Sequence, residues 1–192
     1  MGICMPARWY RFTFPEKDPL ITFLALDSNL PGTKGMDWMP WSYTLTKQER
    51  DEQDAWLREQ LAQPLETPFL IATAHHPLYS NGGHGDNPIL IKEWDALFRE
   101  HKVDLYLTGH DHDLQHLEFA GHPTSFVISG GGGAKLVEWS RPPESRGWGS
   151  RVLGFTDLEI SADSLIVRHV GTQAEAVYAF ERKRGGEVKV LG

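Results

Sequence analysis

Three short apolar runs alternate with two helical patterns in the first part of the chain, and this alternation limits the folds open to it. The runs cover residues 20–26, 69–74 and 103–107, and polar or turn-forming residues follow each of them. Residues 46–62 open with a capping-box pattern, and apolar residues recur at helical spacing through residues 91–98. The order strand, helix, strand, helix, strand predicts an α/β fold with parallel core strands.

The pattern changes after residue 113, where five shorter strands are predicted to form an antiparallel meander. They cover residues 114–119, 124–129, 154–160, 164–170 and 176–182. Between the second and the third of them lies a loop, residues 135–151, that is long for a compact domain. Its length indicates a functional or mobile segment.

The charge of the chain excludes some classes of partner. The 192 residues include 19 Lys and Arg against 26 Asp and Glu, and the formal net charge is -7. An acidic chain opposes electrostatic binding to nucleic acid or anionic lipid, so neither is predicted as a partner. The longest apolar stretches fall far short of the roughly 18 residues that a membrane span needs. Cys4 is the single cysteine, so an internal disulfide is excluded.

Histidines follow two of the predicted strands closely. His75 comes after the second apolar run, and His110 and His112 come after the third. Because parallel strands of one sheet end at the same edge, we expect these three imidazoles to converge. Neutral imidazole is a ligand for Zn, Fe, Mn or Ni, and three of them supply most of the ligands of one ion. Five other histidines are interpreted as hydrogen-bonded residues without a metal: His76, His101, His116, His122 and His169.

The residues around these histidines resemble a known family, the purple, tartrate-resistant-type acid phosphatases of the calcineurin-like metallophosphoesterases. The matching segments are AHHPLYS at residues 74–80, HG at residues 84–85 and YLTGHDHDLQ at residues 106–115, and their order and spacing match as well. Shorter matches at residues 6–10 and 129–132 extend the resemblance over nearly the whole chain.

The resemblance implies a four-layer α/β/β/α sandwich, of which this chain would be the C-terminal half. The family's D-x-H, G-D-x-x-Y and G-N-H-D motifs, which supply its other metal ligands, are absent from the sequence, and no histidine precedes His75. We therefore expect residues 1–192 to be a single partial domain whose N-terminal half is missing and would act in cis. The resemblance also suggests an extracytoplasmic location.

The function that the resemblance implies is a metal-dependent phosphomonoester hydrolase of the acid phosphatase type, acting on a small phosphate ester with metal-activated water. Two ions of Fe, Zn or Mn would form a dinuclear centre, with His75 and His110 on one ion and His112 on the other. His84 would lie beside the substrate phosphate and bind it or protonate the leaving alcohol. Because the bridging carboxylate has no evident source, we expect this chain to bind at most one metal and to be inactive alone.

Other interpretations share the same residues. The chain could be a non-catalytic or partner-dependent fragment, or the full-length protein could be a nucleotide phosphodiesterase. Asp111 could orient a ligand histidine or stabilise its own turn. The glycine run at residues 130–133 is interpreted as a turn rather than an anion-binding nest.

Overall fold

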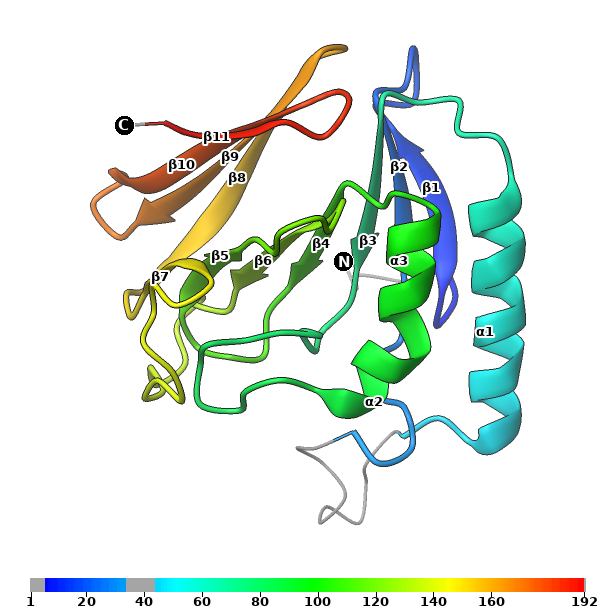
Figure 1. Cartoon of the computed structure of the whole chain (residues 1–192), viewed down its shortest axis with the longest axis horizontal. Helices are drawn as coiled ribbons and strands as arrows, with labels where there is room; N and C mark the ends of the chain where they lie inside the picture. Colours follow the sequence, from blue (N-terminus) through cyan, green and yellow to red (C-terminus); the bar gives the residue numbers. More distant parts are fainter. Residues whose placement is uncertain (1–5, 34–43, 192) are drawn as a thin grey trace.

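The first strands and helices alternate as the sequence predicts (Figure 1). The computed structural model describes residues 6–33 and 44–191, and Cys4 lies outside them. The early elements are β1 (Tyr10–Phe14), β2 (Ile21–Ala25), α1 (Lys47–Ala62) and β3 (Phe69–Thr73). They are followed by α2 (Pro88–Leu90), the π-helical turn η1 (Ile91–Asp95), α3 (Ala96–Glu100) and β4 (Leu105–Thr108).

The strands of the described residues form two sheets. The larger sheet has the order β1-β2-β3-β4-β6-β5-β7 and includes β5 (Leu114–Leu117), β6 (Ser125–Ser129) and β7 (Gly147–Ser150). The smaller sheet has the order β11-β10-β9-β8 and consists of β8 (Gly154–Ile160), β9 (Ser164–Gly171), β10 (Ala176–Lys183) and β11 (Val188–Leu191). Within the larger sheet, β2, β3, β4 and β6 are parallel neighbours. The predicted α/β fold with parallel core strands is therefore confirmed.

The second part of the chain corrects the prediction of one meander. β8 to β11 do pair antiparallel in succession, but β5 and β6 belong to the larger sheet, and β6 pairs in parallel with β4. The sequence analysis also missed β1, β7 and β11, and β7 lies within the predicted loop at residues 135–151. An alternating pattern shows that a segment suits a sheet, but its pairing partner depends on tertiary packing.

Helix α1 begins where the sequence predicts it. The backbone N–H of Glu49 donates to Thr46 Oγ1 at 3.2 Å, and the backbone N–H of Thr46 donates to Glu49 Oε2 at 2.8 Å. This reciprocal pair is the predicted capping box, which satisfies two of the free donors at the helix start. None of the helices that the structure describes is long and apolar enough to span a membrane.

Strand β3 separates two hydrophobic cores. Leu70 and Ala72 pack with the helices, whereas Phe69 and Ile71 pack in the core that contains Phe180 of the smaller sheet. Successive side chains of a strand point to opposite faces, so burial of both faces places β3 in a middle layer. Helices, larger sheet and smaller sheet thus form three layers (Figure 1). Among the described residues, no helix covers the outer face of the smaller sheet.

Three of the histidines that were interpreted as structural have protein partners. His116, His122 and His169 each form hydrogen bonds with other side chains, as expected of them. His169 on β9 is fully buried, its ring stacks on Trp148 and Tyr178, and its Nδ1 lies 2.9 Å from Thr156 Oγ1. Burial lowers the pKa of His169 to about 4.

We expect the free energy of unfolding to fall as the pH decreases from about 6.5 to about 4. In this window the His169 ring is neutral in the folded chain but takes up a proton in the unfolded chain, so acid favours unfolding. His169→Phe keeps an aromatic ring in the stack and removes this titration. Urea unfolding at about pH 7 and about pH 5 should therefore show a smaller loss of stability in the variant than in the wild type. An equal loss in both proteins would contradict the prediction.

Candidate metal centre

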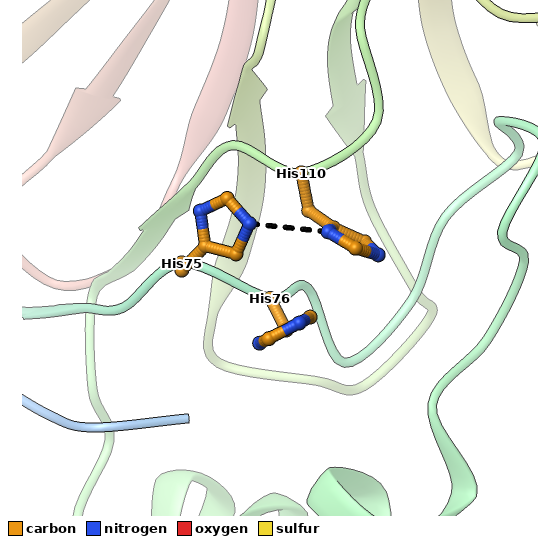
Figure 2. A group of neighbouring side chains, drawn as sticks. All are labelled: His75, His76 and His110. Atoms are coloured by element: carbon orange, nitrogen blue, oxygen red, sulfur yellow. Dashed lines mark hydrogen bonds between the residues drawn. The ribbon is translucent and has the colours of Figure 1, made fainter. Parts of the chain in front are cut away.

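Three histidines meet at adjacent strand ends. His75 and His76 follow β3, His110 follows β4, and the two strands pair in parallel. Beyond the strands, the backbone N–H of Gly109 donates to the carbonyl of His75 at 3.1 Å, which keeps the two segments side by side. One ring nitrogen from each histidine lies within 4.8 Å of the other two. Figure 2 shows the three rings together, with His75 Nε2 3.1 Å from His110 Nδ1.

The donor chemistry of this three-histidine cluster (His75, His76 and His110) fits a transition-metal ion. Two ring nitrogens 3.1 Å apart must share a proton or a cation, because two facing lone pairs repel each other. Burial lowers the pKa of His110 to about 4 and that of His76 to about 3, so both rings are neutral near pH 7 and keep a lone pair. Three neutral imidazoles are a known ligand set for Zn and related ions.

The backbone at His110 is unusual. Its φ angle is 68°, in the left-handed region that residues other than glycine seldom adopt. The backbone N–H of Asp111 donates to the carbonyl of Gly109 at 2.9 Å, so the chain turns tightly around His110. Strained residues of this kind are concentrated at functional sites, where the surrounding structure holds them in place.

His76 joins the cluster, although the sequence analysis excluded it from metal binding. Its backbone N–H donates to Ser28 Oγ at 2.9 Å, and its Nδ1 lies 2.9 Å from the same oxygen. His76 is therefore hydrogen-bonded, as expected, but its place in the three-histidine cluster departs from the expectation that it has no part in a metal site. Because a hydroxyl oxygen can accept both bonds, the second ring nitrogen remains available as a ligand. The signal that could have indicated it is its position directly after His75 at the strand end.

His112 lies outside the three-histidine cluster, although the sequence predicts convergence with His75 and His110. Its Nδ1 donates to the carbonyl of Lys135 at 2.7 Å. The tight turn at His110 sends the two side chains of the H-x-H pair to different neighbours. The bond to Lys135 leaves Nε2 as the nitrogen that a metal could use. A role for His112 on a second ion stays a prediction.

His84 lies beside the cluster, as the sequence predicts. Its ring centroid is 4.1 Å from that of His110, and its Nδ1 is 2.6 Å from Asp111 Oδ1. The sequence offers two roles for Asp111, orienting a neighbouring ligand histidine or stabilising its own turn. The structure pairs it with His84 instead.

The long loop at residues 135–151 is fastened to the loop that carries His84. The backbone N–H of Ser140 donates to the Asn81 carbonyl at 2.9 Å. Arg146 donates to the two carboxylate oxygens of Asp86 at 2.9 and 3.1 Å, and such bidentate pairs fix the geometry of both partners. Sequence reasoning missed Asn81, Asp86 and Arg146, because partners 60 residues apart leave no local pattern.

A cavity of about 100 Å³ opens beside the three-histidine cluster. The residues that line it include the imidazoles of His76, His84 and His110 and the apolar side chains of Pro77, Pro88 and Ile89. A cavity with apolar walls and a few convergent polar groups is typical of a small-molecule site.

Comparisons with known proteins indicate the family of the chain. Residues 7–114 match the model of the calcineurin-like phosphoesterase family. Tartrate-resistant acid phosphatase type 5 of Sus scrofa is 42% identical over 78 residues, which are 41% of this chain and 22% of that protein. The mouse protein of the same name is 27% identical over 188 residues, which are 90% of this chain and 56% of that protein. The chain thus spans about half the length of this relative.

A solved structure supports the fold. Purple acid phosphatase PPD1 from yellow lupin (Lupinus luteus) superposes with a TM-score of 0.73 at 20% sequence identity. The match covers 95% of this chain and 34% of the lupin chain. The family model matches more than half of the residues, which shows that the chain belongs to the calcineurin-like phosphoesterase family.

Proposed function

We propose that this chain carries part of the active site of a metal-dependent phosphoric monoester hydrolase of the acid phosphatase type. The observation that supports it most directly is the convergence of His75, His76 and His110 at the carboxyl edge of a parallel sheet. The similarity to tartrate-resistant acid phosphatases supports the choice of reaction. The substrate would be a small phosphate ester.

The three-histidine cluster would hold one ion of Fe, Zn or Mn. When bound, such an ion would supply Lewis-acid stabilisation of phosphoryl oxygens and would lower the pKa of water. The cavity beside the cluster offers the substrate a place next to these ligands, and Pro77 and Ile89 offer apolar contacts to its organic group.

His84 would act on the substrate rather than on the metal. Its Nδ1 donates to Asp111, so Nε2 is the nitrogen that can meet a phosphate oxygen. In the protonated ring, Nε2–H would donate to that oxygen or give its proton to the departing alcohol oxygen. This assignment predicts that, in a longer form of the protein that has turnover, His84→Ala lowers turnover more than it lowers metal content.

A second ion would need ligands beyond those in the cluster. Within the part of the chain that the structure describes, no carboxylate joins the three imidazoles. Two cations about 3.5 to 4 Å apart repel each other, and bridging oxygen or carboxylate charge must offset this repulsion. We propose that a second ion binds His112 together with residues N-terminal to this chain.

We expect the 192-residue chain by itself to bind at most one divalent ion and to hydrolyse an aryl phosphate negligibly. Neutral imidazoles cannot offset the mutual repulsion of two cations. Calorimetric titration with Zn and Mn gives the stoichiometry, and a colorimetric assay with Mn, Fe or Zn added gives the turnover. Two tightly bound ions with rapid turnover would contradict this expectation.

A panel of phosphomonoesters and nucleotide diesters, applied to a longer form that restores turnover, separates the proposed reaction from a phosphodiesterase.

A further inference from the structure

We propose that Asp111 is a positioning residue that holds His84 in one orientation and one tautomer, with Nε2 presented to the substrate phosphate. This inference rests on the proposed function for the role of His84 towards phosphate. The placement of the His84 ring by Asp111 is a separate claim that can be tested without turnover.

The contacts of Asp111 are made with the His84 loop. Its side chain is fully buried. Oδ1 accepts a hydrogen bond from the backbone N–H of His84 at 3.0 Å and another from His84 Nδ1 at 2.6 Å. Oδ2 accepts a short hydrogen bond from Ser80 Oγ. These partners lie 27 and 31 residues away along the chain, so the carboxylate does not serve its own turn.

The two bonds to Oδ1 determine what the His84 ring can do. Because Oδ1 accepts the backbone N–H of His84, it presents lone pairs, so the ring nitrogen that faces the same oxygen must carry a proton. Because the backbone and the ring of the same residue bind one oxygen, rotation of the ring would break the shorter bond. The neutral ring therefore keeps its lone pair on Nε2, and 43% of the side chain remains exposed for contact with a ligand. A carboxylate that orients a histidine in this way recurs in catalytic sites.

Two glycines allow other segments of the chain to approach Asp111 closely. A Cβ atom on Gly82 would lie 2.5 Å from Asp111 Cγ. A Cβ atom on Gly130, from a different loop, would lie 1.8 Å from the Asp111 carbonyl oxygen. Glycine is required at both positions because the two loops approach Asp111 this closely. Gly82 and Gly130 thus lie directly against Asp111.

Nitrogen-15 NMR of the imidazole rings in the intact 192-residue chain tests the proposal. At a pH where the rings are neutral, we expect His84, assigned through His84→Gln, to be protonated at Nδ1. Asp111→Ala should lose this tautomer, because no acceptor then faces Nδ1. Ser80→Ala is the matched control, since it removes a partner of the same carboxylate without touching His84, and it should retain the Nδ1–H signal.

The outcomes separate this proposal from the proposed function. A wild-type His84 protonated at Nε2, or an equal loss of the Nδ1–H tautomer in Ser80→Ala, would overturn the positioning role. The wild-type measurement alone decides the first point, even if Asp111→Ala fails to fold. Titration of the Zn-loaded chain with inorganic phosphate should shift the His84 Nε2 signal, and this shift should be weaker in Asp111→Ala. Phosphate binding that leaves wild-type His84 Nε2 unchanged would instead refute the role of His84 in the proposed function.

Discussion

Replacing His110 with asparagine is expected to weaken Zn binding by at least about a hundredfold, because changes to residues that only support a ligand already cost 10- to 100-fold. His110 provides a nitrogen 3.1 Å from His75 Nε2 and belongs to the three-histidine cluster. Asparagine suits this position because it tolerates the left-handed backbone, where φ is 68°. The variant should therefore fold normally while it lacks the imidazole. Calorimetric titration with Zn measures the change in affinity.

His112→Gln is the matched control for this experiment. Glutamine can still donate to the Lys135 carbonyl, and His112 lies outside the cluster, so the affinity for one Zn ion should stay close to that of the wild type. If His112→Gln lost the ion while His110→Asn kept it, the assignment of the first metal to the three-histidine cluster would be wrong.

A second large effect, on the stability of the fold, is expected at the glycine run of residues 130–133. We expect Gly130→Ala to destabilise the fold by about 3 kcal/mol or more, because overpacking against rigid backbone forces the chain to shift. The added Cβ would lie 1.8 Å from the Asp111 carbonyl oxygen, which cannot move without disturbing the H-x-H turn. Denaturation by urea measures the loss, and NMR reports whether the folded variant keeps its His84 signal.

Gly132→Ala is the control from the same run, since its Cβ would meet no heavy atom within 4 Å. Its stability should stay within about 1 kcal/mol of the wild type, the usual cost of changing a glycine. A similar loss in both variants would show that the run needs glycine for its backbone angles and not for the contact with Asp111. The glycine run was interpreted as a turn, and the structure adds that Gly130 lies directly against the backbone of Asp111.

The sequence predicted the parts of the site that follow from strand order. His75 and His110 come directly after strands β3 and β4, and parallel strands end together, so their convergence could be inferred without coordinates. Local signals also sufficed for the capping box at Thr46. Such features depend on neighbours in the chain or on the periodicity of one element.

The parts that could not be predicted depend on contacts between distant loops. Asp111 bonds to His84, and Arg146 bonds to Asp86, and neither pair leaves a trace in the spacing of residues. The prediction that β6 belongs to the antiparallel meander was wrong for a related reason. The same alternating pattern suits either sheet, and β6 pairs in parallel with β4. The position of His112 also involves a distant contact, because its Nδ1 donates to the carbonyl of Lys135, 23 residues away.

Strand β3, which leads to His75, is buried on both faces, and this burial affects the entropy cost of binding an ion. The strand that leads to His75 is locked between two cores, and its neighbour β4 is held in the same way through Leu105 and Tyr106. Segments buried this deeply open only with global unfolding, so their backbone is already ordered before an ion arrives. Binding to His75 and His110 then requires little further loss of conformational entropy. The positions of His75 and His110 are therefore set by folding of the polypeptide, before a metal ion binds.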